Sequence, residues 1–329
     1  MPLPAKFLTA ALITAALLAA ATSQAAADPV AGFQTLEIAG PAGPRIEAAV
    51  WYPARAEARP MRLGLGTQVV APGAAIAGEA LPLVVVSHGN GGSLAGHADT
   101  AQALAEAGFV VAALTHVGDN YRDQSRATDM PKRSRELGLL LDHMLTRWAD
   151  RDRLDAGRVG AFGFSSGGFT VLTAAGAVPD PSLILEHCQG HLDFYDCRLA
   201  AKHLADPSAW GGWRQDRRIR ALVAAAPALG YALAGGLDRV DVPLQLWQAE
   251  LDEVLPAPFY VEPVLAGLPR RPEYHLVREA GHFDFLTPCA RPEDAPALCR
   301  SRAGFDPAAF HRTFNGAVVR FFQAALAPR

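Results

Sequence analysis

Short apolar runs that alternate with amphipathic segments constrain the fold of this chain more than any other feature. Leu83–Val86 and Phe109–Leu114 are continuously apolar, which is typical of strands buried on both faces. Ala98–Ala107 lies between them, suits a helix, and is ended by Gly108. Strands that alternate with helices predict an α/β fold with a mostly parallel sheet and helices on both faces.

The alternation continues along the chain and predicts a single domain. Apolar residues at helical spacing predict a helix through Leu137–Trp148, and Asp306 followed by Pro307 is expected to begin the last helix. We expect residues 53–80, rich in Gly, Ala and Pro, to form a long surface loop. The eight predicted strands are Phe33–Ile38, Arg45–Tyr52, Leu83–Val86, Phe109–Leu114, Val159–Phe164, Ile219–Ala225, Val242–Gln248 and Tyr274–Arg278.

The first 27 residues differ from the rest and predict a secretory signal peptide. Lys6 precedes Phe7–Ala21, an unbroken run of apolar residues and Thr, and small residues at positions 25–27 offer a cleavage site before Asp28. A membrane anchor is the alternative, but the run is shorter than the ~20 residues that span a bilayer. We therefore expect a mature chain of residues 28–329 that is periplasmic or secreted and has no stable membrane span.

Four cysteines lie downstream of this segment, in two couples that are close in sequence. In an oxidising compartment an even number of cysteines indicates disulfides, and proximity favours Cys188–Cys197 and Cys289–Cys299 among three possible pairings. Zinc binding is the alternative, but no C-x-x-C motif occurs and neither spacing suits a zinc finger. We predict two disulfides and no metal site.

The segment Gly163-Phe164-Ser165-Ser166-Gly167 matches the pattern G-x-S-x-G. In this pattern a strand turns sharply into a helix, which lifts the serine hydroxyl clear of the sheet, and the glycines leave room for the turn. Here a buried strand precedes the match and a helix is expected after it. We predict Ser165 as a nucleophile, whereas Ser166 fails the pattern because Phe164 stands where glycine is needed.

A serine nucleophile needs a base and an acid that orients the base. His282 follows the last predicted strand, at the carboxyl edge of the sheet where open α/β sheets carry their sites. Asp252 follows the strand before it, and the order serine, acid, histidine is that of the α/β-hydrolases. We predict His282 as the base and Asp252 as the acid, with Glu250 and Glu253 as alternatives.

An oxyanion formed by attack on a carbonyl needs two backbone donors. The amide of Ser166, at the start of the helix after the nucleophile, is one prediction. The segment 87–92, Ser-His-Gly-Asn-Gly-Gly, follows a predicted strand, and its glycines allow close approach to a ligand. We predict the amide of Asn90 as the second donor, with the neighbouring glycines as alternatives. The segment lacks the G-x-x-x-x-G-K-[ST] pattern of a phosphate-binding loop.

Residues 178–218 interrupt the alternation and contain several aromatic residues and the first cysteine couple. We interpret them as a cap or lid insertion stapled by a disulfide, with a surface loop as the alternative. The candidates for the substrate pocket are Trp210 and Trp213 in this insertion, and His88, His116, Asp119 and Asn120 after central strands. His116, Asp119 and Asn120, which follow the predicted strand Phe109–Leu114, could equally be turn residues.

Five motifs occur together in this order: Trp51-Tyr52-Pro53, Ser87-His88-Gly89, His116-Val117-Gly118-Asp119-Asn120, Gly163-Phe164-Ser165-Ser166-Gly167-Gly168 and Gly281-His282-Phe283. In this combination the chain resembles bacterial proteins described as predicted dienelactone hydrolases, which are similar to the platelet-activating factor acetylhydrolases. The resemblance covers most of the mature chain. It implies an α/β-hydrolase fold and cleavage of carboxylic esters without a cofactor, with Ser165 as nucleophile, His282 as base and Asn90 as oxyanion donor.

The sequence departs from these families in two places. True dienelactone hydrolases use a cysteine nucleophile where this chain has Ser165, so the resemblance does not imply dienelactone as the substrate. The acetylhydrolases take their acid from the strand nearer the nucleophile, and here that strand ends in Ala224-Ala225-Ala226-Pro227 without a carboxylate. This departure favours Asp252 on the following strand.

The sequence therefore predicts a serine hydrolase that cleaves small-molecule carboxylic esters. The alternatives are amide or peptide hydrolysis by the same residues, a secreted polyester depolymerase, and a non-catalytic binding protein that keeps the fold. Half of the residues (50%) are hydrophobic, which is enough for a large core. The net charge of −3, without a basic stripe, gives no indication of a nucleic-acid partner.

Overall fold

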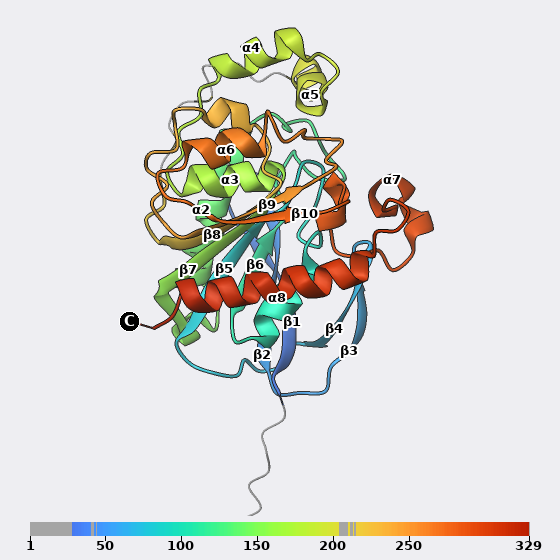
Figure 1. The fold of residues 1–329 in the computed structure, drawn as a ribbon. Coiled ribbons are helices and arrows are strands. Elements are labelled where there is room, and N and C mark those ends of the chain that lie inside the picture. Colours follow the sequence, from blue (N-terminus) through green and yellow to red (C-terminus); the bar gives the residue numbers. More distant parts are fainter. Residues whose placement is uncertain are drawn as a thin grey trace, which may run out of the picture.

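The computed structural model describes residues 28–40, 43, 45–203, 210, 213 and 215–328. The predicted signal peptide, residues 1–27, therefore lies outside the described residues. The described chain forms one ten-stranded sheet with helices on both faces (Figure 1). The strands are β1 (Val30–Ile38), β2 (Ile46–Ala54), β3 (Arg59–Leu63), β4 (Gly66–Pro72), β5 (Leu81–Ser87), β6 (Val110–Leu114), β7 (Leu154–Phe164), β8 (Ile219–Ala225), β9 (Leu244–Ala249) and β10 (Glu273–Val277).

The sheet has the order β10-β9-β8-β7-β5-β6-β2-β1-β4-β3. The strands from β10 to β6 in this order are all parallel to their neighbours. β2 then pairs antiparallel with both β6 and β1, and β3 pairs antiparallel with β4. All parallel strands of the first group end at one edge, so the loops that follow β5, β7, β9 and β10 meet there.

The predicted α/β class is confirmed, but the predicted number of eight strands was wrong. Each of the eight predicted strands is present, and β3 and β4 form a hairpin inside residues 53–80, which we expected to be a surface loop. In β4 buried and exposed residues alternate, and buried Gln68 accepts a hydrogen bond from Trp51 Nε1 at 2.6 Å. The Gly- and Pro-rich composition around the hairpin hides this alternation in the sequence.

Successive residues of the central strands point into two different cores, one on each face of the sheet. In β5, Leu83 and Val85 pack in the core beneath the helices α2, α3 and α6. Val84 and Val86 pack in the opposite core, beneath α1 and α8. The continuous apolar runs of the sequence follow from this burial on both faces.

The helices cover the two faces and one end of the sheet (Figure 1). Their bounds are α1 (Ala98–Glu106), α2 (Met130–Thr146), α3 (Ser166–Ala174), α4 (Ser182–Gly190), α5 (Tyr195–His203), α6 (Val261–Gly267), α7 (Pro296–Cys299) and α8 (Pro307–Ala325), with short 3₁₀ helices η1 (Arg151–Arg153), η3 (Gly230–Leu233), η4 (His282–Phe285) and η5 (Pro292–Asp294). Asp306 caps α8 as predicted, because its side chain accepts a hydrogen bond from the amide of Ala309.

The predicted insertion 178–218 contains α4 and α5, which lie at the top of the molecule in Figure 1, beyond α3 and α6. Both predicted disulfides are confirmed. Cys188–Cys197 joins α4 to α5, and Cys289–Cys299 joins the segment after η4 to α7. Each bridge therefore crosslinks a segment that lies outside the sheet, and neither crosslinks strands of the sheet.

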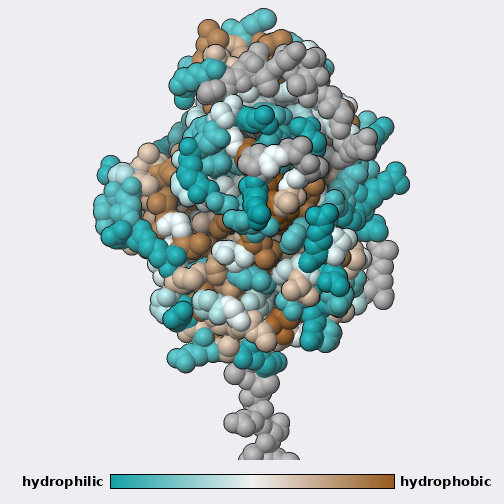
Figure 2. Space-filling view, turned by 180° about the vertical axis from the view of Figure 1, so that it is seen from behind, coloured by the Kyte–Doolittle hydropathy of each residue, from teal (hydrophilic) through white to brown (hydrophobic). Residues whose placement is uncertain are grey.

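On the face opposite α8, hydrophilic residues predominate and apolar residues gather in patches near the centre (Figure 2). Within the described part of the chain, no helix combines the length and the apolar character that crossing a membrane requires.

Candidate active site

Ser165 occupies a sharp turn between β7 and α3. Its backbone is in a strained conformation, with φ +56° and ψ −121°, which few residues other than glycine adopt. A Cβ on Gly163 would lie 2.1 Å from the carbonyl oxygen of Gly167, and one on Gly167 would lie 1.9 Å from that of Ser87. Only glycine fits at both positions, so the two glycines of the motif make this turn possible.

His282 lies beside the hydroxyl of Ser165. Its Nε2 is 3.1 Å from Ser165 Oγ, and its Nδ1 is 2.8 Å from Asp252 Oδ2. The side chains of His282 and Asp252 are only 2% and 3% exposed. Phe164 packs against the imidazole, with ring centroids 4.8 Å apart, and limits its rotation. Loops after three different strands therefore bring a serine, an imidazole and a carboxylate into one hydrogen-bonded chain.

The other two acidic candidates have different partners. Glu250 pairs with Arg278 and accepts a hydrogen bond of 2.9 Å from the amide of Glu279. Glu253 faces the backbone of His282, whose amide lies 3.4 Å from Glu253 Oε2. Asp252 is the one of the three whose carboxylate contacts the imidazole nitrogen.

The two predicted oxyanion donors lie on adjacent elements. Ser166 is the first residue of α3, where backbone amides are free to face a ligand. Asn90 lies in the segment 88–92 after β5, which we call the oxyanion loop after the role predicted for it. A Cβ on Gly89 would lie 3.2 Å from Ser165 Cβ, so the loop passes directly beside the serine.

An apolar cavity opens beside Ser165 and Ser166. It has a volume of about 50 Å³ and lies between the sheet edge and the helices α4 and α5. The large apolar side chains that line it are Met130, Ile184, Leu185, Leu199, Trp210, Leu229 and Leu255. Trp210 was predicted to be a pocket residue, and the structure places it there.

The other predicted pocket residues lie elsewhere. His116, Asp119 and Asn120 are buried beneath the oxyanion loop, and His88 is the buried first residue of that loop. None of the four lines this cavity. Burial lowers the pKa of both His88 and His116 well below the usual range, and the positive charge of Arg133 lowers each further. These imidazoles are therefore neutral at pH 7.

Trp213 packs on Phe169 with ring centroids 5.8 Å apart, and also against Trp210. It was predicted to be a pocket residue, but it supports the cavity wall from behind.

The residues that hold α5 over the cavity were not among the predicted site residues. The hydroxyl of Tyr195 donates a hydrogen bond to the side-chain oxygen of Asn90. Asp196 accepts hydrogen bonds from Tyr260 at 2.8 Å and Tyr231 at 2.7 Å, both on the sheet side. The aromatic content of the insertion was visible in the sequence, but nothing local indicates which partners these residues meet.

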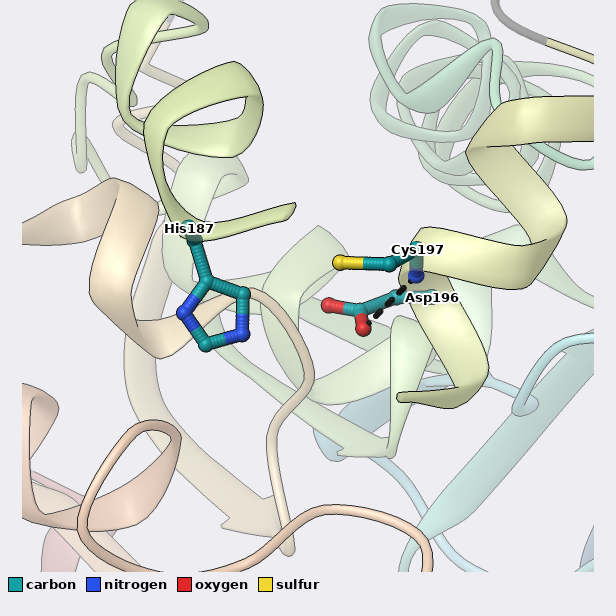
Figure 3. Close-up of side chains that lie close together, drawn as sticks. All are labelled: His187, Asp196 and Cys197. Atoms are coloured by element: carbon teal, nitrogen blue, oxygen red, sulfur yellow. Dashed lines mark hydrogen bonds between the residues drawn. The ribbon is translucent and has the colours of Figure 1, made fainter. Parts of the chain in front are cut away.

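Three potential metal ligands cluster at the junction of α4 and α5: His187, Asp196 and Cys197 (Figure 3). Their chemistry does not fit a metal ion, because the sulfur of Cys197 is in a disulfide and provides no thiolate. The carboxylate of Asp196 already accepts the two tyrosine hydroxyls, and His187 stacks on Tyr231 with ring centroids 3.8 Å apart. The cluster joins the two helices to the rest of the molecule.

Comparison with known proteins agrees with this architecture. Residues 64–136 match the family model described as platelet-activating factor acetylhydrolase, isoform II. Ferulic acid esterase from Streptomyces cinnamoneus is structurally similar over 94% of this chain and 93% of its own, with a TM-score of 0.59 and 19% identity. A predicted CIB-like hydrolase from Thermoplasma acidophilum matches 88% of this chain and 99% of its own, with a TM-score of 0.49 and 13% identity. No curated protein matches the sequence.

The sheet topology and the similarity to a solved structure over nearly the whole chain define the class of fold: this protein has the α/β-hydrolase fold. Residues 64–136 relate it to the platelet-activating factor acetylhydrolase family. The predicted resemblance is thereby confirmed over these residues, and the predicted enzyme class of carboxylic ester hydrolase agrees with it.

Proposed function

We propose that this protein is an exported serine esterase that cleaves small-molecule carboxylic esters through an acyl-enzyme at Ser165. The observation that carries the proposal is the hydrogen-bonded chain from Ser165 Oγ to His282 Nε2, 3.1 Å, and from His282 Nδ1 to Asp252 Oδ2, 2.8 Å. It lies at the mouth of an apolar cavity, where an acyl group can be bound out of water.

The proposed reaction has two steps. His282 takes the proton of Ser165 as the hydroxyl oxygen attacks the ester carbonyl, and the imidazolium then gives that proton to the leaving alcohol. In the second step His282 removes a proton from water, which attacks the acyl carbonyl and releases the acid and free Ser165. The Asp252 carboxylate stabilises the imidazolium in both steps, and the amides of Asn90 and Ser166 stabilise each oxyanion.

The size and lining of the cavity favour a small, uncharged acyl group as the part of the ester that binds there. Its lining is mostly apolar, and α4 and α5 stand over it, joined to each other by Cys188–Cys197 and to the sheet side through Asp196. We propose that these helices form a cap. A capped apolar cavity favours small esters over the long polymer chains that a polyester depolymerase must admit.

Export is supported by the two disulfides, which form and persist in oxidising compartments. Together with the signal-peptide pattern of the first 27 residues, they favour a periplasmic or secreted enzyme. Edman sequencing of the exported protein is expected to begin at or near Asp28, and an intact N-terminus on a membrane-bound protein would contradict export by cleavage.

Hydrolysis of a p-nitrophenyl ester series, from acetate to palmitate, tests the proposed activity. Replacing Ser165 by Ala is expected to lower the rate by about 10⁴- to 10⁶-fold, because the three side chains act as a unit. The matched p-nitroanilides separate esterase from amidase activity, and the short esters are expected to be the better substrates. Wild-type turnover in Ser165→Ala would refute the proposal.

A further inference from the structure

We propose that Asp119 and Arg133 are positioning residues that fix the oxyanion loop against the nucleophile helix α3. This inference rests on the proposed function, because the loop has a catalytic task only if the amide of Asn90 stabilises an oxyanion. Neither side chain lines the cavity, and both are nearly inaccessible, with Asp119 1% and Arg133 2% exposed. Arg133, on α2, belongs to none of the sequence motifs described above.

Asp119 holds the loop from below at two consecutive residues. Its Oδ1 accepts a hydrogen bond of 2.6 Å from Asn90 Nδ2 and one of 2.9 Å from the amide of Gly91. One carboxylate oxygen thus fixes both the side chain of the proposed donor residue and the peptide that follows it. These two hydrogen bonds therefore fix the orientation of the backbone amide of Asn90, which is the proposed oxyanion donor.

Arg133 connects the loop to α3. Its Nη1 donates to Asp119 Oδ2 and its Nη2 to the carbonyl oxygen of His88, the first residue of the loop. Its Nε lies 3.2 Å from Thr170 Oγ1, and that hydroxyl donates a 2.8 Å hydrogen bond to the carbonyl of Ser166. A single planar guanidinium therefore links the elements that carry both proposed oxyanion donors.

The loop needs such support because its own sequence provides little rigidity. It contains three glycines, and Gly91 has φ +66°, a conformation that glycine adopts without strain. Stabilisation of an oxyanion depends on donors that are already in place before charge develops. The buried ion pair supplies that order from outside the loop.

A second serine–histidine–carboxylate relay supports the same loop. Ser87 Oγ lies 2.9 Å from His116 Nε2, and His116 Nδ1 lies 2.8 Å from Glu136 Oε2. Ser87 and His116 are completely inaccessible, so no substrate reaches this hydroxyl. The amide of His116 donates a 3.0 Å hydrogen bond to His88 Nε2, which ties the relay to the loop.

The test compares kcat, KM and the affinity for a trifluoromethyl ketone, which forms a tetrahedral oxyanion adduct with the serine. In Asp119→Asn, kcat for p-nitrophenyl acetate is expected to fall by about 10²-fold while KM changes little. The reason is that a correctly placed Asn90 amide stabilises the oxyanion but is not needed to bind the ester. The affinity for the ketone is expected to fall with kcat. Arg133→Lys is expected to lose less, and the double variant no more than Asp119→Asn alone.

Leu141→Ala is the control, because Leu141 is buried in the core on the same helix as Arg133 but far along it from the loop contacts. It is expected to lower the melting temperature while leaving kcat and ketone affinity unchanged, since its role is in packing. Unchanged kcat and ketone affinity in folded Asp119→Asn would overturn the inference, as would a change confined to KM.

Asn90→Ala provides a second route if Asp119→Asn fails to fold. It removes the side-chain amide that donates to Asp119 Oδ1, while Asp119 keeps its ion pair with Arg133. We expect kcat and ketone affinity to fall together by about tenfold, as for a weakened oxyanion donor. Wild-type values would overturn the inference, whereas activity that persists in Ser165→Ala would instead overturn the proposed function.

Discussion

At the scale of single residues, neighbouring acidic side chains differ in which part of His282 they contact. Asp252 and Glu253 are adjacent, but Asp252 contacts the imidazole of His282 whereas Glu253 faces its backbone amide. Asp252 is itself fixed, because its Oδ1 accepts hydrogen bonds from the amides of Val254 at 3.0 Å and Leu255 at 2.7 Å. A carboxylate held in this way can select the imidazole tautomer that leaves Nε2 free to accept a proton.

Replacing Asp252 by Asn is therefore expected to lower kcat by about 10⁴-fold, because an amide favours the wrong tautomer and does not stabilise the imidazolium. Glu253→Gln is the matched control and is expected to retain kcat within a factor of about ten, since its oxygen meets only a backbone amide. Steady-state kinetics on p-nitrophenyl acetate measure both. The opposite ranking of the two variants would assign the acid to Glu253.

Sequence reasoning located the candidate residues better than it located their supports. Ser165, His282 and Asp252 could be proposed from their positions after strands, because parallel strands end at one edge. Arg133 and Tyr195 could not be proposed, because their partners are distant in sequence: Arg133 contacts the carbonyl of His88, and Tyr195 contacts Asn90. Contacts of this kind depend on how α2 and α5 lie against the segment 88–92, and a local sequence pattern does not predict that packing.

At the scale of elements, the residue that precedes α1 is a buried histidine, His97. His97 is 2% exposed, packs on Phe162 and Phe164, and both ring nitrogens lack a hydrogen-bond partner apart from a weak interaction with the backbone of Phe285. Burial lowers its pKa to about 4, although nearby Asp99 acts in the opposite direction. His311 is close as well and adds to the lowering.

This histidine is expected to destabilise the fold in acid. Below pH 6.5 the unfolded chain binds a proton at His97 that the folded chain, with its pKa of about 4, does not bind, so stability is lost between these values. The loss from pH 7.5 to pH 5 is about 2 kcal/mol. Replacing His97 by Leu should remove this part of the pH dependence, as measured by urea unfolding at both pH values. An unchanged difference would contradict it.

Other buried groups set the background for that measurement. His88 and His116 also have lowered pKa values and contribute in the same direction, so the variant keeps part of its acid sensitivity. The pKa of His311 is raised, chiefly through its hydrogen bond with Asp99 against the effect of burial. Its contribution is present in acid and is lost as the pH rises through that pKa.

The pair α4 and α5 is expected to shape access to the cavity. Replacing Cys188 and Cys197 by Ser removes the link between these helices, and closing so short a loop is worth about 2–3 kcal/mol. We expect KM for p-nitrophenyl acetate to rise and kcat to change little, because Ser165 and its partners remain in place. Cys289→Ser with Cys299→Ser is the matched control and should leave both constants unchanged. Equal effects of the two double variants would contradict a specific role for the cap.

At the scale of the whole molecule, the sheet topology explains why residues so distant in sequence meet. Ser165 and His282 are separated by 117 positions, yet both follow strands that end at the same edge. The parallel half of the sheet was predictable because its continuous apolar strands have one simple cause, burial on both faces. The β3–β4 hairpin was not, because its alternation is short and lies among glycines and prolines.

Labelling by a fluorophosphonate tests most directly the proposal that Ser165 is the nucleophile of an esterase. The mature protein is treated with the probe, digested and mapped by mass spectrometry, beside Ser165→Ala. We predict a single phosphonylated peptide, containing Ser165, with loss of ester hydrolysis in proportion to labelling and no labelling of the variant. Full ester hydrolysis by a protein labelled at another residue, or by one that is not labelled at all, would contradict the proposed role of Ser165.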